Sequence, residues 1–200
     1  MNLPKAVDQL VGELSKLPGV GRRSAERLAL HLAVGPGERL ESLADALQAV
    51  RQSVSACEIC GSLREGDACA LCSDPSRDAS TIVVVERSLD VIAMEKASGF
   101  RGHYHVLGGL LSPLRGVAPS MLRLTELGDR LAHEGVRELV LATPPTVEGD
   151  ATSLYISRQF SRDGLAITRL GRGVPQGGSL EHADAGTLRM ALQGRQRVEP

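Results

Sequence analysis

The sequence predicts an α/β protein with an all-α N-terminal part, a small four-cysteine module, a parallel sheet flanked by helices and a C-terminal helix. Three observations carry this prediction. Apolar residues recur at helical spacing up to residue 54. Two Cys-x-x-Cys pairs follow between residues 57 and 72. Strand-like and helix-like segments then alternate, as in parallel sheets with right-handed crossovers. The predicted parts are residues 1–54, 55–76, 80–175 and 176–200.

Composition limits the ways in which this chain can contact nucleic acid. The formal net charge is -1, so a contact with nucleic acid requires a local basic patch. Aromatic residues make up 2% of the chain and Trp is absent, which argues against a surface that stacks successive bases. Contact with the phosphate backbone, with little sequence preference, is the expected mode. The apolar runs are too short for a membrane span, so no membrane contact is expected.

Three amphipathic helices are predicted before the first cysteine. The first spans residues 4–15, and Pro4 suits its first turn. The second starts at Arg22, after the turn Leu17-Pro18-Gly19-Val20-Gly21. The third follows the break at residues 35–37 and carries Leu40, Leu43, Ala44, Leu47, Val50 and Val54. Such small helices bury little core, so this part requires the cysteine module or a partner subunit for stability.

The turn between the first two helices offers a site for phosphate. Gly19 and Gly21 let a phosphate approach backbone N–H groups at the start of a helix, where the dipole adds positive charge. Helix, LPGVG turn and helix resemble the helix-hairpin-helix motif of proteins that bind DNA without sequence preference. The DNA-binding candidates are Lys16, Gly19, Gly21, Arg22, Arg23 and Arg27. The alternative is an ordinary helical hairpin with solvated arginines, and His31 on the same face fits either interpretation.

The four cysteines of the chain predict a structural zinc site. Cys57, Cys60, Cys69 and Cys72 form two Cys-x-x-Cys pairs, in which both thiolates can face one Zn2+ at about 2.3 Å. The eight-residue spacer has turn residues at both ends, and its shortness predicts a minimal ribbon without a helix of its own. Four thiolates fill the coordination shell, so the single zinc per chain is expected to be structural.

Two disulfides, a redox Cys-x-x-Cys and unligated core cysteines are the alternatives. Disulfides require an oxidising compartment, and no signal peptide is recognisable at the N-terminus. A redox pair usually opens the helix of a βαβ unit, which neither pair does. A cytoplasmic protein is therefore expected.

Strands and helices alternate from residue 80 onward. The run from Thr81 to Val85 is typical of a buried parallel strand. Further strands are predicted at 104–107, 138–142 and 166–169, and helices at 88–97, 121–131 and 150–162. Ligand sites in such sheets lie at the carboxyl ends of the strands.

Acidic residues follow two of these strands. Glu86 closes the first strand, and Glu148 and Asp150 follow the third as an acidic-x-acidic pair. This pattern resembles the Toprim domain, whose carboxylates hold Mg2+ at a phosphodiester. Position 148 departs from the usual aspartate, and neither Tyr104 nor Tyr155 is placed as an attacking nucleophile. A weak Mg2+ site or a protein contact is expected rather than a catalytic centre; helix capping by Asp150 is the simpler alternative.

The C-terminal segment combines glycines with a last helix. Residues 171–178 lack the lysine and hydroxyl of a phosphate-binding P-loop, so a flexible connection is the preferred interpretation. The following short helix, with its apolar stripe around Leu188 and Leu192, packs on its own domain or on a neighbouring subunit.

A helix-hairpin-helix, a four-cysteine module and a Toprim domain, in this order, are similar to the RecR family of bacterial recombination mediators. The segments YHVLGG, LSPLRGVAP and ATPPTVEGDATSLYI add to the resemblance. It implies a repair protein without enzymatic activity, which forms a ring-shaped oligomer, a tetramer, around DNA. It also implies action with RecO and RecF to load RecA onto single-stranded DNA coated by single-strand binding protein, close to the nucleoid. The acidic group would dock RecO.

Two other functions remain open at this stage. One is a Mg2+-dependent nuclease of Toprim type, and the other is a structural DNA-binding module without repair partners. The nuclease requires the acidic residues for strand cleavage, whereas the mediator requires them for partner binding.

Overall fold

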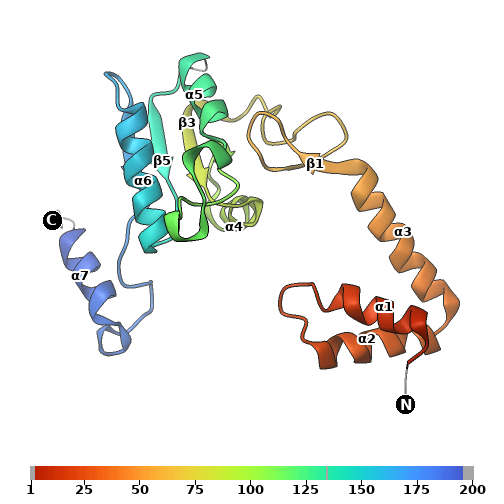
Figure 1. The fold of residues 1–200 in the computed structure, drawn as a ribbon. Coiled ribbons are helices and arrows are strands. Elements are labelled where there is room, and N and C mark those ends of the chain that lie inside the picture. Colours follow the sequence, from red (N-terminus) through yellow and green to blue (C-terminus); the bar gives the residue numbers. More distant parts are fainter. Residues whose placement is uncertain (1–2, 134, 196–200) are drawn as a thin grey trace. The chain divides into compact units, whose positions relative to one another are not determined.

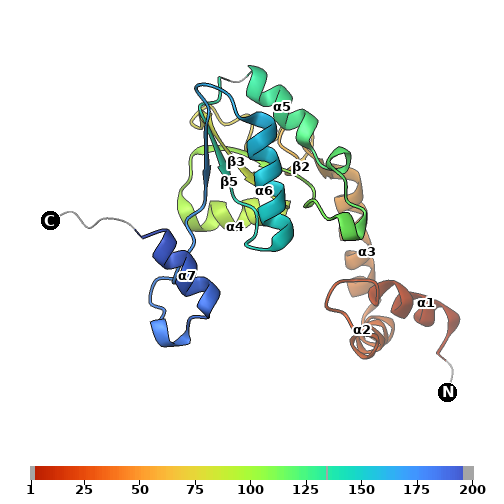
Figure 2. The ribbon, with the colours of Figure 1, turned by 60° about the vertical axis from the view of Figure 1, so that its left-hand side comes forward.

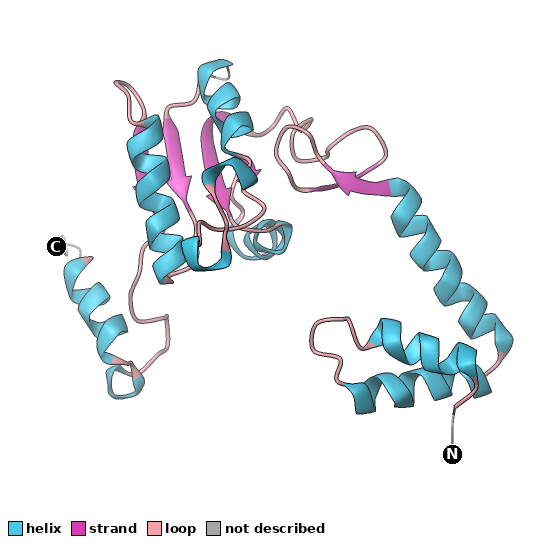
Figure 3. Cartoon of the chain, viewed as in Figure 1, coloured by secondary structure: helices cyan, strands magenta, loops and turns pink. Residues whose placement is uncertain are grey.

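The computed structural model describes residues 3–133 and 135–195 of the chain. Residues 1–2 and 196–200, the outermost parts of the first and last predicted segments, lie outside the described residues, as does residue 134. The chain forms two compact units, the first ending at Ser55 and the second beginning at Ala56 (Figure 1). The predicted fold class is confirmed: helices come first, and a parallel sheet flanked by helices follows (Figure 3).

The first unit contains three helices, as predicted: α1 (Lys5–Leu14), α2 (Arg22–Val34) and α3 (Gly37–Ser53). α1 and α2 pack through Val11, Ala25 and Ala29, which are at most 1% exposed. The two alanines allow the helix backbones to approach closely. α3 has no buried residue, and its stripe of apolar side chains is exposed over Leu40, Leu43, Leu47 and Val50.

The sheet of the second unit has the strand order β4-β3-β5-β6, and all its pairs are parallel. Its strands are β3 (Asp78–Val85), β4 (Gly102–Val106), β5 (Glu138–Leu141) and β6 (Ala166–Arg169). β3 pairs on both edges, with Val83 opposite Tyr104 and Val140. Residues 82–85 are at most 1% exposed, as the continuous β-branched run predicts.

Helices cover both faces of the sheet. α5 (Leu124–His133) and α6 (Val147–Phe160) lie on one face, where Ile82 and Val84 pack with Leu127 (Figures 1 and 2). α4 (Ser88–Ser98) covers the other face, where Val83 and Val85 pack with its residue Val91. α7 (Ala185–Gln193) follows β6 after a loop.

Two predicted helix starts are wrong, and Val54, predicted as part of the third helix, lies instead in the strand β1 (Val54–Ala56). The prediction includes Met121 in the helix that becomes α5, but Pro119–Met121 forms a separate 3-10 turn and α5 begins at Leu124. α6 begins at Val147 rather than at residue 150 because Thr146 caps it: its hydroxyl oxygen accepts the Gly149 N–H at 3.1 Å. Asp150 therefore lies inside the first turn and is not the cap.

A fully buried histidine makes the stability of this fold pH-dependent. His105 of β4 donates its Nε2 hydrogen to the Arg123 carbonyl at 2.7 Å, and its Nδ1 has no hydrogen-bond partner in the described chain. Burial lowers the pKa of His105 from 6.5 to about 4. Below pH 6.5 the His105 side chain binds a proton in the unfolded chain but stays neutral in the folded chain. The free energy of unfolding therefore falls as the pH is lowered from 6.5 to 4.

We expect His105→Gln, which retains an N–H donor but does not titrate, to weaken this pH dependence. Each pKa unit corresponds to about 1.4 kcal/mol, so the variant should lose about 3 kcal/mol less stability than the wild type on acidification from about pH 7 to about pH 4. Urea unfolding at both pH values measures the difference. An equal loss of unfolding free energy in the wild type and the variant would show that His105 does not cause the pH dependence.

Candidate metal centre and nucleic-acid interface

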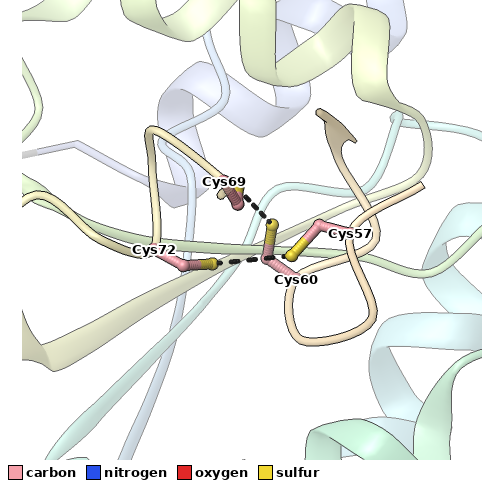
Figure 4. Close-up of side chains that lie close together, drawn as sticks. All are labelled: Cys57, Cys60, Cys69 and Cys72. Carbon is pink, nitrogen blue, oxygen red and sulfur yellow. Dashed lines mark hydrogen bonds between the residues drawn. The ribbon is translucent and has the colours of Figure 1, made fainter. Parts of the chain in front are cut away.

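The structure brings the four cysteines into one cluster. Their sulfur atoms all lie within 4.8 Å of one another (Figure 4). The Sγ–Sγ distance is 3.9 Å between Cys57 and Cys72, and 3.7 Å between Cys60 and Cys69. Four sulfurs at about 2.3 Å from a tetrahedral zinc ion are about 3.8 Å apart, so the cluster has the size of a zinc site. The four thiols are free, and these separations are far longer than a disulfide bond.

Two tight turns position the sulfurs. The first pair lies between the short strands β1 (Val54–Ala56) and β2 (Leu63–Glu65), where the Cys57 N–H donates to Ser62 and the Gly61 N–H to Cys57. Gly61 has a φ of 72°, and a Cβ there would lie 2.8 Å from the Val106 carbonyl oxygen, so only glycine fits. At the second pair the Cys72 and Ser73 N–H groups both donate to the Cys69 carbonyl.

One sulfur of the cluster already favours negative charge. The neighbouring Cys72 thiol is the main cause that lowers the pKa of Cys60 to about 5, whereas burial raises the pKa of Cys69. The pKa of Cys72 is raised, chiefly by the same pairing. A bound cation such as zinc stabilises all four thiolates and releases the remaining protons. The donor set therefore fits zinc.

The cysteine module is joined to the sheet of the second unit. The Val106 N–H donates to the Cys60 carbonyl at 2.7 Å, and the Arg123 guanidinium donates to the carbonyl of Glu58. Leu71, beside the fourth cysteine, packs against the core under α4. The cysteine module is thus a brace for the edge of β4.

The turn that is predicted to bind phosphate has an open backbone. Gly19 has a φ of 80°, and added Cβ atoms at Gly19 and Gly21 would meet no atom within 4 Å, so the turn is open to a ligand. Gly21 precedes α2, whose first turn has no side-chain cap. Its outward N–H groups are the donors expected at an anion site.

The basic side chains at this turn divide into two groups. Arg23 and Arg27 are exposed and have no acidic partner among the described residues. Arg22 pairs with Glu26 at 3.2 Å, and Lys16 with Glu13 at 2.7 Å. Arg23 and Arg27 are therefore the basic side chains near this turn that can bind a ligand without first breaking an ion pair. His31 faces Arg39, with 2.8 Å between their nitrogens.

Each predicted acidic residue has an arginine beside it. Glu86 lies 3.9 Å from Arg87, and Glu148 lies 3.9 Å from Arg115. All four of these side chains are at least partly exposed. Within the described ranges, the cysteines are the only group of three or more His, Cys, Asp or Glu close enough to share a metal ion. The three carboxylates are thus not gathered into one such group.

Asp150 has two arginine partners that sequence patterns did not reveal. Arg172 donates to it at 2.5 Å, and Arg169 makes a second, close ion pair. Arg172 and then Arg169 lower the pKa of Asp150, so this carboxylate stays ionised. Cations supplied by the protein itself thus neutralise Asp150. Residues 19 and 22 positions apart in the sequence leave no local pattern by which to predict this contact.

Tyr104 is not available as a nucleophile. It is 1% exposed, and its hydroxyl donates to Glu95 at 2.7 Å. Burial, followed by this hydrogen bond, raises the pKa of Tyr104. Glu95 in turn accepts two hydrogen bonds from Arg77, so the tyrosine belongs to a structural network.

We expect Cys57→Ser to lose the metal and to destabilise the second unit. Structural zinc contributes directly to folding free energy, and the wild type should hold about one zinc per chain. Elemental analysis and thermal unfolding measure both effects. Ser53→Ala, a matched change outside the cluster, should retain zinc. A stable wild-type protein without metal would contradict the assignment.

Comparisons with known proteins agree with this architecture. Residues 80–171 match the Toprim domain family, residues 7–51 match the family described as RecR, helix-hairpin-helix, and residues 173–196 match RecR, C-terminal. In the described residues no helix is both long and apolar enough to cross a membrane.

Three relatives that match over nearly the full length of the chain share one name. The chain is 49% identical over 198 residues to "Recombination protein RecR" of Thermus thermophilus, covering 99% of this chain and 100% of that protein. It is 47% identical over 192 residues to the protein of the same name from Cutibacterium acnes, covering 96% of each chain. The relative from Acidothermus cellulolyticus is 45% identical over 193 residues, with 96% and 97% covered. Taken with the hairpin, cysteine cluster and sheet, these matches mean that the chain belongs to the RecR family.

Proposed function

We propose that this protein is a recombination mediator in DNA repair. It forms an oligomeric clamp on DNA and acts with RecO and RecF to load RecA onto single-stranded DNA coated by single-strand binding protein. The observation that carries the proposal is the open turn before α2, where an uncapped helix start lies beside Arg23 and Arg27 in a chain of the RecR family. The protein works in the cytoplasm, at the nucleoid.

Backbone contact explains how such a chain binds DNA. The N–H groups at the start of α2 and the guanidinium groups of Arg23 and Arg27 bind phosphate oxygens, which are the same at every base pair. A net charge of -1 gives the chain no overall attraction to DNA, so several copies of the hairpin act together in a ring. We assign DNA binding to residues 1–54.

An oligomer is supported by the apolar stripe of α3. Leu40, Leu43, Leu47 and Val50 are 40–65% exposed on one helical face. A stripe of this kind is buried when subunits associate, and a tetrameric ring is the assembly we propose. Light scattering that gave a monomer, both with and without DNA, would contradict it.

The remaining parts support the clamp rather than a catalytic step. The module at residues 55–76 holds one structural zinc, and residues 176–195 form a C-terminal loop and helix. The domain at residues 80–175 offers Glu86, Glu148 and Asp150 as a docking surface for RecO. We assign no catalytic activity, because each carboxylate faces an arginine that competes with a metal ion.

The clamp predicts that Arg23→Glu with Arg27→Glu weakens DNA binding at every sequence tested. Two lost phosphate contacts should also reduce the salt slope of binding by about 2. Fluorescence anisotropy over a range of salt concentrations measures both quantities. Lys96→Glu with Arg158→Glu changes the net charge equally outside the hairpin and should have little effect. Unchanged binding by the hairpin variant would remove this turn from the DNA interface.

The acidic residues separate the mediator from a Mg2+-dependent nuclease. The wild type should cleave neither single- nor double-stranded DNA with Mg2+, and Glu86→Gln should weaken binding to RecO. Asp163→Asn, an exposed neutralisation in the loop after α6, is the control and should bind RecO normally. Strand cleavage by the wild type that Glu86→Gln abolishes would establish the nuclease instead.

A further inference from the structure

A cavity of about 610 Å3 lies at the carboxyl end of the sheet. Leu141 and Arg169 end two neighbouring parallel strands there, and Gly186, Thr187 and Met190 of α7 also line the cavity. This is the edge at which open parallel sheets bind ligands. The volume falls within the range of about 300–1,000 Å3 that is usual for small-molecule sites.

Two arginines converge in this cavity. Arg169 and Arg172 line it together with Asp150, to which both are bonded. Two guanidinium groups facing one carboxylate leave one positive charge in excess. Their side chains are 31% and 20% exposed, so neither is sealed from a ligand. The Nε of Arg169 is buried and has no acceptor in the described structure.

The other acidic group of the cavity is already engaged. Both carboxylate oxygens of Asp184 accept hydrogen bonds from Thr187, one from the backbone N–H at 2.9 Å and one from the hydroxyl at 2.7 Å. Asp184 caps the start of α7, where the helix dipole offsets its charge. The two arginines and two aspartates of the cavity balance in formal charge, but Asp184 is held by Thr187, so the two guanidinium groups with their one carboxylate, Asp150, form a locally cationic end.

The glycine-rich segment after β6 acquires a role in this site. Gly171 and Gly173 line the cavity on either side of Arg172. An added Cβ at Gly171 would meet no atom within 4 Å, so the backbone is open there. Apolar walls come from Leu141, Leu170 and Met190. The site thus combines a cationic end with an apolar surface.

We infer that this cavity binds a phosphomonoester, with the phosphate on Arg169 and Arg172 and the rest of the molecule against the apolar wall. Guanidinium forks bind phosphate oxygens in a bidentate manner, and Asp150 holds both forks in place. The phosphomonoester comes from a free mononucleotide or from the 5′ end of a DNA strand. This inference does not depend on the hairpin of the first unit.

Isothermal titration calorimetry with the full-length protein tests the site. AMP should bind, adenosine should not, and inorganic phosphate should compete with AMP. Arg172→Gln should weaken AMP binding by about tenfold or more, because a charge-assisted contact is lost. The AMP affinity of Arg172→Lys should lie between those of the wild type and Arg172→Gln, because lysine retains the positive charge but lacks the bidentate guanidinium group. Arg158→Gln, on the exposed side of α6, should bind as the wild type does.

NMR spectra of the wild-type protein test the same site without a variant, so the result does not depend on whether a variant folds. AMP should shift the amide resonances of Gly171, Gly173 and Thr187. A 5′-phosphorylated oligonucleotide that binds more tightly than its 5′-hydroxyl form, with the difference lost in Arg172→Gln, would identify the DNA end as the source. AMP binding without that difference would identify the free mononucleotide. Equal binding of AMP and adenosine, or an equal loss in Arg158→Gln, or shifts elsewhere only, would overturn the inference.

Discussion

Burial of β3 on both faces is the constraint on which the second unit depends. Its residues from Ile82 to Val85 contact α5 and α6 on one side and α4 on the other. Parallel strands pair along both of its edges, so β3 has no edge exposed to solvent. A strand held in this way cannot slip in register without turning its apolar side chains to the wrong face. Glu86 therefore has a fixed position at the end of β3, and β5 and β6 are likewise fixed beside the arginine-lined cavity.

Arginines at this sheet edge compete with a metal ion for the carboxylates. A hard cation requires carboxylates that converge with little competition. Here Asp150 is held between Arg169 and Arg172, and Glu148 lies beside Arg115. The charge that an ion would bring is already supplied by side chains. The same domain architecture can thus present an edge suited to anions, because a few arginines change what the edge attracts.

Local patterns in the sequence predict the helices and strands, but they do not predict contacts between residues that are far apart in the chain. The helical spacing of α1 and the β-branched run of β3 identify those elements because each pattern lies within one segment. The spacing of the cysteines was similarly informative, since two short turns bring the sulfurs together. The start of α6 was misplaced because Thr146 competes with Asp150 as a cap. The contact of Arg123 with Glu58 spans 65 positions, and only the folded chain reveals it.

The joint between the cysteine module and β4 has a further consequence. β4 is an edge strand, and its Val106 N–H points away from β3 to the Cys60 carbonyl. An uncovered strand edge is a template for pairing with other chains. Displacement of the cysteine module would therefore expose the outer edge of β4 to pairing with other chains. A metal ion that holds the module in place would thus protect the protein from aggregation as well as stabilise it.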